Sequence, residues 1–309
     1  MGAADVVPGV SVGTIAFITG IYQRLINAIK SFDANLIKLL KNRHFSKAWA
    51  HVDGSFLLTL GMGIVVSLIT LAKAIKFLLT NYPLFIWSFF FGLIIASIFF
   101  LYKEIKKWDL FTIISLSIGT AIAYYITIAA PTQTTEARWF IFISGMIAIS
   151  AMILPGISGS FLLLLMGKYT FILGTISSLV NHLKTFDIEG IIADGTIGVI
   201  FGLGCLTGLL SFSRLIAWIL KHYWNITIAL LTGFMIGSLN KVWPWKRIIE
   251  TYVDRHGVEK TLIEQSILPG SYQQLVGDAH LTICLMLMLF GAGLVFALTK
   301  LADKNNQSN

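Results

Sequence analysis

Two stretches of this chain are alike although they lie half a chain apart: PGVSVGTIAFITGIY at residues 8–22 and PGISGSFLLLLMGKY at residues 155–169. Aligned without a gap, at an offset of 155 − 8 = 147 positions, they share five residues. The shared pairs are Pro8/Pro155, Gly9/Gly156, Ser11/Ser158, Gly20/Gly167 and Tyr22/Tyr169. Because the chain has only six prolines, chance is a poor explanation for this agreement. The pattern indicates an internal duplication.

The similarity continues beyond these stretches at an offset of 194 − 53 = 141 positions. The further pairs are Asp53/Asp194, Gly54/Gly195, Gly61/Gly202, Gly63/Gly204, Tyr82/Tyr223, Gly92/Gly233 and Ser97/Ser238, with Lys73 opposite Arg214. The offset changes because the first half has a longer linker between Tyr22 and Asp53. We therefore predict one membrane domain over residues 1–309, built from repeat 1 at about 1–130 and repeat 2 at about 138–300.

The composition predicts an all-α integral membrane protein. The chain is 56% hydrophobic and 12% charged, whereas a soluble protein has about a quarter of its residues charged. Apolar runs of about 20 residues, the length of a membrane crossing, recur along it. The net charge of +8 fits attraction to anionic lipid head groups. Nucleic acid is not an expected partner, because the basic residues are spread over the linkers without interleaved aromatic residues.

Charges in the linkers predict how the crossings are oriented. Full crossings are expected at about 54–79, 83–102, 109–130, 196–220, 225–243 and 281–300. With three per half, the second half would be inverted relative to the first. The linker 23–52 is strongly basic, which favours the cytoplasmic side. Its equivalent at 170–193 is not basic and is expected outside, as is the loop 244–280, in which both signs are mixed.

The linker 23–52 also has apolar residues at helical spacing, with lysines between them. This pattern is typical of an amphipathic helix that lies on the membrane surface. A solvated basic loop is the alternative.

Around the Pro-Gly pairs we expect re-entrant helical hairpins. Residues 138–154 are apolar but short for a crossing, Pro155 and Gly156 break the helix, and an apolar run resumes at 160–176. A hairpin that enters the membrane and returns to the same side accommodates both lengths, and two full crossings are the alternative. Only seven residues precede Pro8, so the descending arm of the first hairpin is expected to be short or missing.

The Pro-Gly-x-Ser turns are candidate anion sites. Proline suits the first turn of a helix, glycine permits close approach to the backbone, and free N–H groups at the start of a half-helix attract anions. Two such turns meeting from opposite faces would suit phosphate. The candidate binding residues are Pro8, Gly9, Ser11, Gly13, Thr14, Pro155, Gly156, Ser158, Gly159 and Ser160. The alternative is that Pro and Gly only kink the helices while the serines bond back to carbonyls.

Charged residues within or beside the crossings are secondary candidates. Lys73 and Arg214 are the basic pair that the repeats match within crossings, and each could contact the substrate or snorkel to the surface. Asp53 and Asp194 each precede a glycine, where a helix N-cap is the favoured interpretation. Together with Asp5 beside the first turn, they are candidate coupling carboxylates.

The runs ADVVPGVSVGTIAFITGIYQRLI at 4–26 and LPGISGSFLLLLMGKY at 154–169 resemble bacterial polyprenyl-phosphate transporters, a family formerly described as a domain of unknown function. The resemblance covers most of the chain. It implies a flippase in the cytoplasmic (inner) membrane that moves undecaprenyl phosphate for reuse as the carrier lipid of cell-wall precursors. By this resemblance Pro8, Gly9, Ser11, Pro155, Gly156, Ser158 and Ser160 belong to the signature turns. The family has glycine where Val12 stands.

Two other functions use similar turns. A membrane phosphatase of polyprenyl pyrophosphate would need an arginine after the serine and paired glutamates, whereas Val12 and Gly159 follow the serines here. A small-anion channel or exporter would use the same helix dipoles. We therefore expect a transporter that is not an enzyme and that has no metal, no cofactor and no ATP-binding loop. Whether it forms a homo-oligomer is left open.

Overall fold

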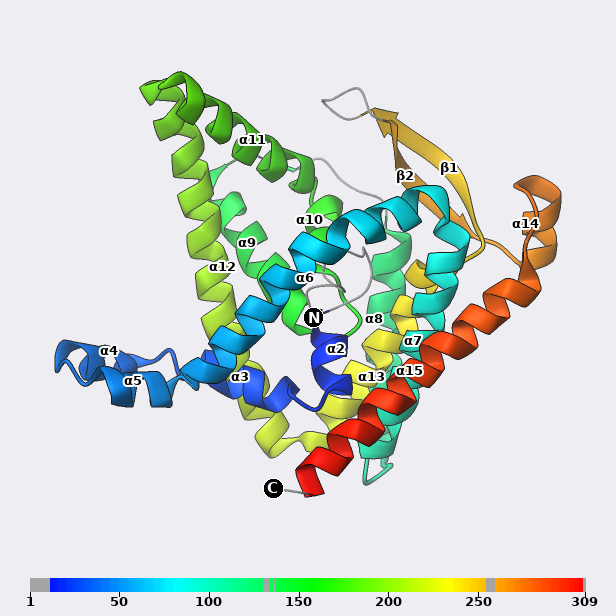
Figure 1. Cartoon of the computed structure of the whole chain (residues 1–309), viewed down its shortest axis with the longest axis horizontal. Coiled ribbons are helices and arrows are strands. Elements are labelled where there is room, and N and C mark those ends of the chain that lie inside the picture. Colours follow the sequence, from blue (N-terminus) through cyan, green and yellow to red (C-terminus); the bar gives the residue numbers. More distant parts are fainter. Residues whose placement is uncertain (1–11, 130–133, 136, 254–258, 308–309) are drawn as a thin grey trace.

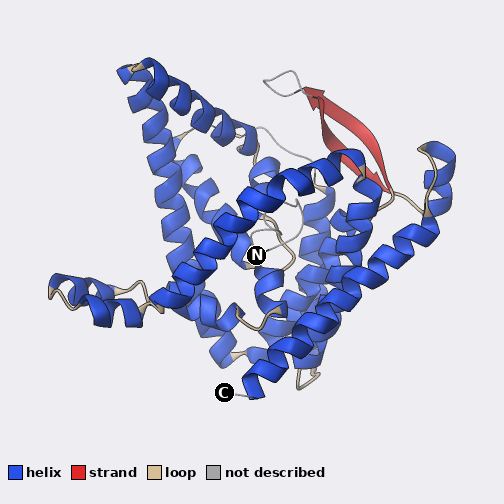
Figure 2. Cartoon of the chain, in the orientation of Figure 1, coloured by secondary structure: helices blue, strands red, loops and turns tan. Residues whose placement is uncertain are grey.

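Long apolar helices dominate the computed structural model, which describes all residues except 1–11, 130–133, 136, 254–258 and 308–309 (Figures 1 and 2). The first half contains α2 (Val12–Ile18), α3 (Tyr22–Lys30), α4 (Ala34–Lys41), α5 (Phe45–His51), α6 (Gly54–Asn81), α7 (Pro83–Glu104) and α8 (Leu110–Ile128). The second contains α9 (Arg138–Ile153), α10 (Gly159–Leu165), α11 (Tyr169–Thr185), α12 (Ile188–His222), α13 (Trp224–Val242), α14 (Pro269–Leu275) and α15 (Leu281–Gln307).

Four of the described helices, α7, α8, α12 and α13, are long and apolar enough to cross a membrane. A fifth span is present if α5 and the start of α6, which meet at an angle of 66°, are counted together. The apolar part of α15, Leu281–Ala297, is shorter, as is α9. The predicted crossings at 83–102, 109–130 and 225–243 are thus confirmed as apolar helices, while α12 begins at Ile188 rather than near residue 196.

A two-stranded antiparallel hairpin departs from the all-α expectation. Strands β1 (Lys246–Val253) and β2 (Glu259–Ser266) occupy part of the segment expected to be a charged loop. The sequence KRIIETYV of β1 is rich in β-branched residues, which favour a strand. Its pairing with β2 includes Lys246 opposite Ser266 and Ile248 opposite Glu264, with an irregular register around Ile249. The mixed charges concealed this strand pattern in the sequence.

The basic linker forms three short helices in place of one amphipathic helix. Asp33 interrupts the helical pattern, because its carboxylate accepts the N–H of Leu36 at 3.0 Å and so begins α4 as a new helix. The same carboxylate oxygen lies 3.0 Å from Nε2 of His51, which ties α5 back against α4. In Figure 1 both helices project from the body of the molecule. Apolar side chains on them remain exposed, including Phe45 and Trp49.

The two halves have matching local geometry. Helices α2 and α10 each have seven residues, and each is followed by a glycine with positive φ, 70° at Gly20 and 65° at Gly167. Helices α6 and α12 are followed by the matched C-cap residues Tyr82 and Tyr223, whose backbone angles agree within a few degrees (φ −135° and −133°).

The last long helix of each half packs against the other half. Helix α15 runs parallel to α7, since Phe85 contacts His280 near one end and Phe100 contacts Phe296 near the other, with ring centroids 5.4 and 5.0 Å apart. Helix α8 runs parallel to α13 in the same way. There the Ser115 hydroxyl donates to the carbonyl of Ile226 at 2.9 Å, and farther along the Asn240 amide donates to the Thr127 hydroxyl at 2.8 Å.

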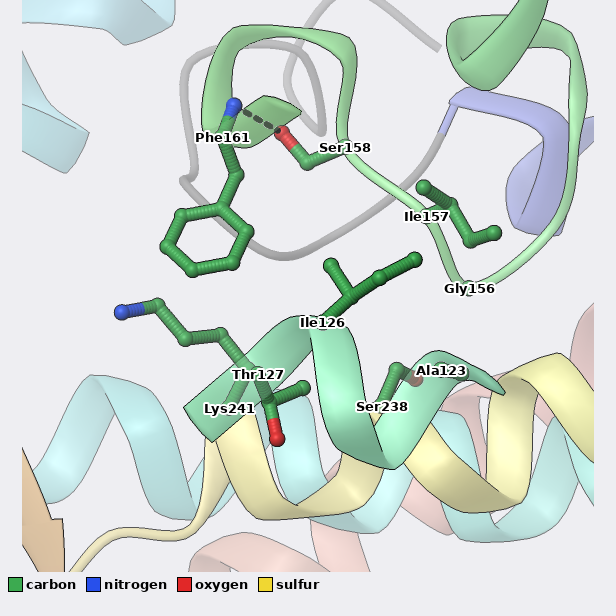
Figure 3. A pocket seen from close by; sticks show the side chains of 9 residues that line it. All are labelled: Ala123, Ile126, Thr127, Gly156, Ile157, Ser158, Phe161, Ser238 and Lys241. Carbon is green, nitrogen blue, oxygen red and sulfur yellow. Dashed lines mark hydrogen bonds between the residues drawn. The ribbon is translucent and has the colours of Figure 1, made fainter. Parts of the chain in front are cut away.

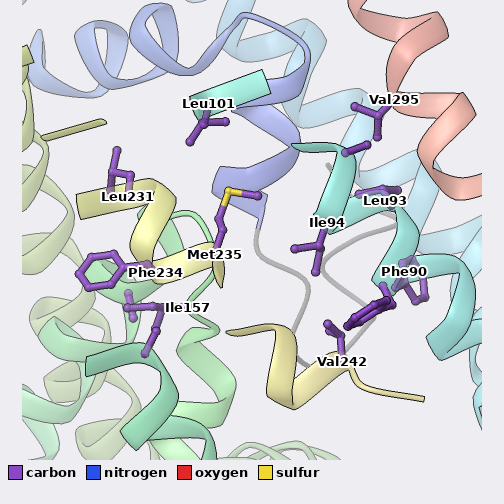
Figure 4. Packing of buried hydrophobic residues seen from close by; sticks show 14 of the residues in the cluster. Phe90, Leu93, Ile94, Leu101, Ile157, Leu231, Phe234, Met235, Val242 and Val295 are labelled. Atoms are coloured by element: carbon purple, nitrogen blue, oxygen red, sulfur yellow. The ribbon is translucent and has the colours of Figure 1, made fainter. Parts of the chain in front are cut away.

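The equivalent helices α7 and α13 run antiparallel through the core. At one end the Trp224 indole N–H donates to the carbonyl of Glu104 at 3.3 Å, and at the other Leu84 packs with Trp245. Between these ends lies the main hydrophobic cluster, in which Ile94 is 1% exposed and Met235 is fully buried (Figure 4). This packing holds α13 firmly in the middle of the molecule, where it forms one wall of the site described next.

Candidate functional site

The second Pro-Gly motif forms the tip of a helical hairpin. Helix α9 leads to the tip and α10 returns beside it, since Gly159 packs against Ala148 of α9. The open end of the hairpin is closed by hydrogen bonds to Thr134, whose hydroxyl donates to the carbonyl of Met166 and whose carbonyl accepts the Lys168 ammonium at 3.1 Å. Lys168 is only 2% exposed. The returning arm is shorter than expected, because it breaks at Gly167 before α11 begins.

The tip is pressed against α13. Gly156 has φ +82°, in the left-handed region that favours glycine, and an added Cβ would lie 2.8 Å from backbone atoms of Phe234 and Met235. No other residue type fits this conformation and this close approach without strain. The position therefore requires glycine for a structural reason, independently of any ligand.

The tip also contacts the segment that follows the first motif. The Gly156 N–H donates to the Thr14 hydroxyl at 3.2 Å, and Thr14 is 1% exposed. Gly13 lies directly against the backbone between Ile153 and Pro155, with no room for a Cβ. Among the predicted site residues, the structure thus brings Gly13 and Thr14 against Pro155 and Gly156. Pro8, Gly9, Ser11 and Asp5 lie outside the described residues.

A small pocket lies between the tip, α8 and α13 (Figure 3). It is lined by Ala123, Ile126, Thr127, Gly156, Ile157, Ser158, Phe161, Ser238 and Lys241. Ser158 caps α10, since its hydroxyl oxygen accepts the Phe161 N–H at the long distance of 3.5 Å. The same oxygen lies 3.0 Å from the Ser160 hydroxyl. Two predicted residues, Gly156 and Ser158, therefore line the pocket, with Gly159 and Ser160 next in the chain.

Lys241, in the last turn of α13, is the cation among the described residues that line this pocket, and sequence reasoning missed it. The repeat does not single out Lys241, because the equivalent residue 141 positions earlier (241 − 141 = 100) is Phe100. A usable signal was present, because a lysine near the end of an expected crossing must pair, reach a cavity or snorkel. Its ammonium lies 4.6 Å from the centre of the Phe161 ring (Figure 3).

The β-hairpin places further charges beside Lys241. The Glu264 carboxylate lies 3.5 Å from the Lys241 ammonium and 3.0 Å from that of Lys246. Burial lowers the pKa of Lys246 to about 8, against the opposing attraction of Glu264. For Glu264, burial would raise the pKa, but the two ammonium groups prevail and the pKa is lowered. Two cations thus share one carboxylate at the edge of the pocket.

Of the two predicted basic residues, Arg214 contacts another part of the molecule. The Arg214 guanidinium donates to the carbonyl of Phe32 at 2.8 Å and so connects α12 with the linker before α4. Lys73 lies on α6.

The N-cap interpretation of the two matched aspartates holds in position for Asp53 and is wrong for Asp194. Asp53 is the N-cap residue of α6, although its side chain makes no cap hydrogen bond there and its carboxylate pairs with Arg24 of α3 at 2.6 Å. Asp194 lies inside α12, which begins earlier than expected and is capped by Asp187. The Asp194 carboxylate lies 3.1 Å from Nδ1 of His182 in α11, an ion-pair distance without hydrogen-bond geometry. Each aspartate thus pairs a long helix with a helix that precedes it in the chain, α6 with α3 and α12 with α11.

The long apolar helices and the internal helical hairpin define a multi-pass α-helical membrane protein. The profile of the undecaprenyl phosphate translocase-like family matches residues 1–260, and the chain belongs to this family. It is 43% identical over 305 residues, 98% of this chain and 94% of the relative, to a protein of Vibrio cholerae named polyprenyl-phosphate transporter. A Staphylococcus aureus protein of the same name is 34% identical over 256 residues, 79% of this chain and 83% of the relative. No solved structure matches the chain.

Proposed function

We propose that this chain is a flippase for polyprenyl phosphate and that it holds the phosphate in the pocket beneath the hairpin tip. One observation carries the proposal beyond family membership: the predicted Pro-Gly-x-Ser turn lines a pocket whose wall also contains a lysine. A phosphate monoester carries up to two negative charges and accepts several hydrogen bonds. A serine hydroxyl and an ammonium group in a largely apolar pocket are suitable partners for it. The two relatives named polyprenyl-phosphate transporters support this substrate class.

We further infer that the two halves are inverted repeats. The antiparallel course of α7 and α13 supports this, as does the reciprocal packing of α15 on α7 and of α8 on α13. In this arrangement the α9–α10 hairpin enters the bilayer and returns to the side from which it came. Polypeptide that interrupts a helix at membrane depth is tolerated where it lines a cavity, and the hairpin tip does so.

The proposed activity is transport across the cytoplasmic membrane. It involves no covalent chemistry and uses no nucleotide. Moving a dianion inward against an inside-negative potential costs about 2 × 2.3 kcal/mol per 100 mV. Partial protonation of the phosphate or an accompanying cation would reduce this cost. A passive scramblase and a proton-coupled flippase therefore differ in how their rates respond to an imposed pH gradient.

The test uses purified protein in liposomes that contain undecaprenyl phosphate, with head-group accessibility as the readout and no nucleotide present. We expect equilibration across the bilayer in protein-containing liposomes only. Ser158→Ala should slow it roughly tenfold or more, since a hydrogen bond to a charged group contributes about 1.5–3 kcal/mol. Ser177→Ala is the matched control, because that exposed serine bonds only to the Leu173 carbonyl of its own helix.

Three results would contradict the proposal. Release of phosphate from undecaprenyl pyrophosphate by the protein would favour the phosphatase alternative. Flux of inorganic phosphate without lipid movement would favour an anion channel. An absolute requirement for ATP would exclude the proposed mechanism.

A further inference from the structure

We propose that Lys241 binds the phosphate group in this pocket and that Glu264 of the β-hairpin is held mainly by Lys246, which leaves the charge of Lys241 available to the phosphate. This inference rests on the proposed function and adds a ligand that the repeat pattern does not reveal. Lys241 emerges from the last turn of α13, on the opposite side of the pocket from the hairpin tip, as Figure 3 shows.

The surroundings of Lys241 leave its charge available. Apolar side chains from α8 and the tip, Ala123, Ile126 and Ile157, form much of the pocket wall. The Phe161 ring covers the ammonium group from above, 4.6 Å away, which favours a cation there without neutralising it. The Lys241 side chain is 23% exposed. A charge in such surroundings attracts an anion more strongly than one in open water.

Among the described residues, the neighbouring ion cluster has two ammonium groups and one carboxylate, so its charges are not balanced. Lys246 is well satisfied: its ammonium donates to Glu264 at 3.0 Å and to the Lys241 carbonyl at 2.6 Å, and it lies 4.6 Å from the centre of the Trp87 ring. The Glu264 carboxylate accepts a hydrogen bond from Lys246 at 3.0 Å and forms a longer ion pair with Lys241, at 3.5 Å. Lys246 is therefore the principal partner of Glu264, and Lys241 supplies the excess positive charge.

A phosphate in the pocket would complete this cluster. It would compete with Glu264 for Lys241 while Glu264 remains bound to Lys246. Losing Glu264 should therefore leave phosphate binding intact or strengthen it, whereas losing Lys241 should weaken it. A purely structural Lys241–Glu264 ion pair makes a different prediction, because removing either partner would then have the same consequence.

The experiment measures binding of undecaprenyl phosphate, and separately of inorganic phosphate, to the full chain in nanodiscs. The variants are Lys241→Gln, Lys241→Arg and Glu264→Gln. Lys221→Gln serves as the control, because Lys221 is an exposed lysine in the last turn of α12. Thermal melting of each variant reports on folding.

We expect Lys241→Gln to weaken lipid binding at least about tenfold, with Lys241→Arg within a few-fold of the unchanged chain. Glu264→Gln and Lys221→Gln should not weaken it. Binding of the lipid but not of inorganic phosphate would assign the site to a lipid head group, whereas equal binding of both would assign it to free phosphate.

If Lys241→Gln and Glu264→Gln weaken lipid binding equally, the inference is overturned and Lys241 and Glu264 form a structural ion pair. Unchanged binding in Lys241→Gln would overturn it while leaving the proposed function in place. Absence of lipid binding by the unchanged chain would overturn both. If Lys241→Gln fails to fold, the Glu264→Gln variant still decides. Weakened lipid binding by Glu264→Gln would contradict the inference, and unweakened lipid binding would support it.

Discussion

At the scale of single residues, the contact between Thr14 and Gly156 joins the two motif regions. Thr14→Val keeps the shape of the side chain but removes the oxygen that accepts the Gly156 N–H. An unsatisfied buried donor costs about 1–3 kcal/mol, so we expect a lower melting temperature and a weaker hold on the hairpin tip. Thr196→Val is the control, since that hydroxyl bonds only to Ile192 of its own helix. Equal melting temperatures would show that the contact is unimportant.

Part of the site could be predicted from residues alone. The repeat identified Gly156 and Ser158 because both positions match across the two halves, and the structure brings both to a pocket. The repeat could not identify Lys241, which has no counterpart, or Thr14 as the partner of Gly156, which depends on the tertiary contact. It did select Arg214, whose guanidinium instead bonds to the Phe32 carbonyl. A match between the two halves shows only that two positions descend from one duplicated position. A binding site also uses residues that only one half supplies.

At the scale of elements, the hairpin tip depends on the backbone of Gly156. In Gly156→Ala the added methyl group meets the backbone of α13, and φ becomes unfavourable, which together cost about 1–3 kcal/mol or more. We expect a lower melting temperature and slower lipid movement. Gly195→Ala is the control, because nothing lies within 4 Å of the added methyl group and alanine favours the helix. If both variants melt alike, the tip does not pack on α13 as described.

Element lengths were predictable where apolar length alone determines them. Helices α7, α8 and α13 follow directly from uninterrupted apolar runs. The early start of α12 could not be predicted in this way, because Asp187 and Glu189 make residues 188–195 resemble a linker. In the structure Asp187 caps the helix there. The sequence does not reveal the strands β1 and β2 clearly, because charges of both signs are mixed with their β-branched residues. The three helices of the basic linker depend on contacts made by Asp33 that helical spacing does not reveal.

At the scale of the whole molecule, the inverted arrangement predicts opposite sides for equivalent segments. Single cysteines at Asn42 and Thr185, both exposed, should react with a membrane-impermeant reagent from opposite sides. The background should carry Cys205→Ala and Cys284→Ala, which remove the two native cysteines. The strongly basic segment around Asn42 is expected on the cytoplasmic side. Labelling of both positions from one side would contradict the inverted repeat.

The most direct measurement is a high-resolution map of the chain in nanodiscs loaded with undecaprenyl phosphate. We predict phosphate density inside the pocket walled by Gly156, Ser158 and Lys241, with a phosphate oxygen about 3 Å from the Ser158 hydroxyl or the Lys241 ammonium. The tail should leave the pocket toward the bilayer. Phosphate density beside Arg214, or at any place remote from the hairpin tip, would contradict the proposed site.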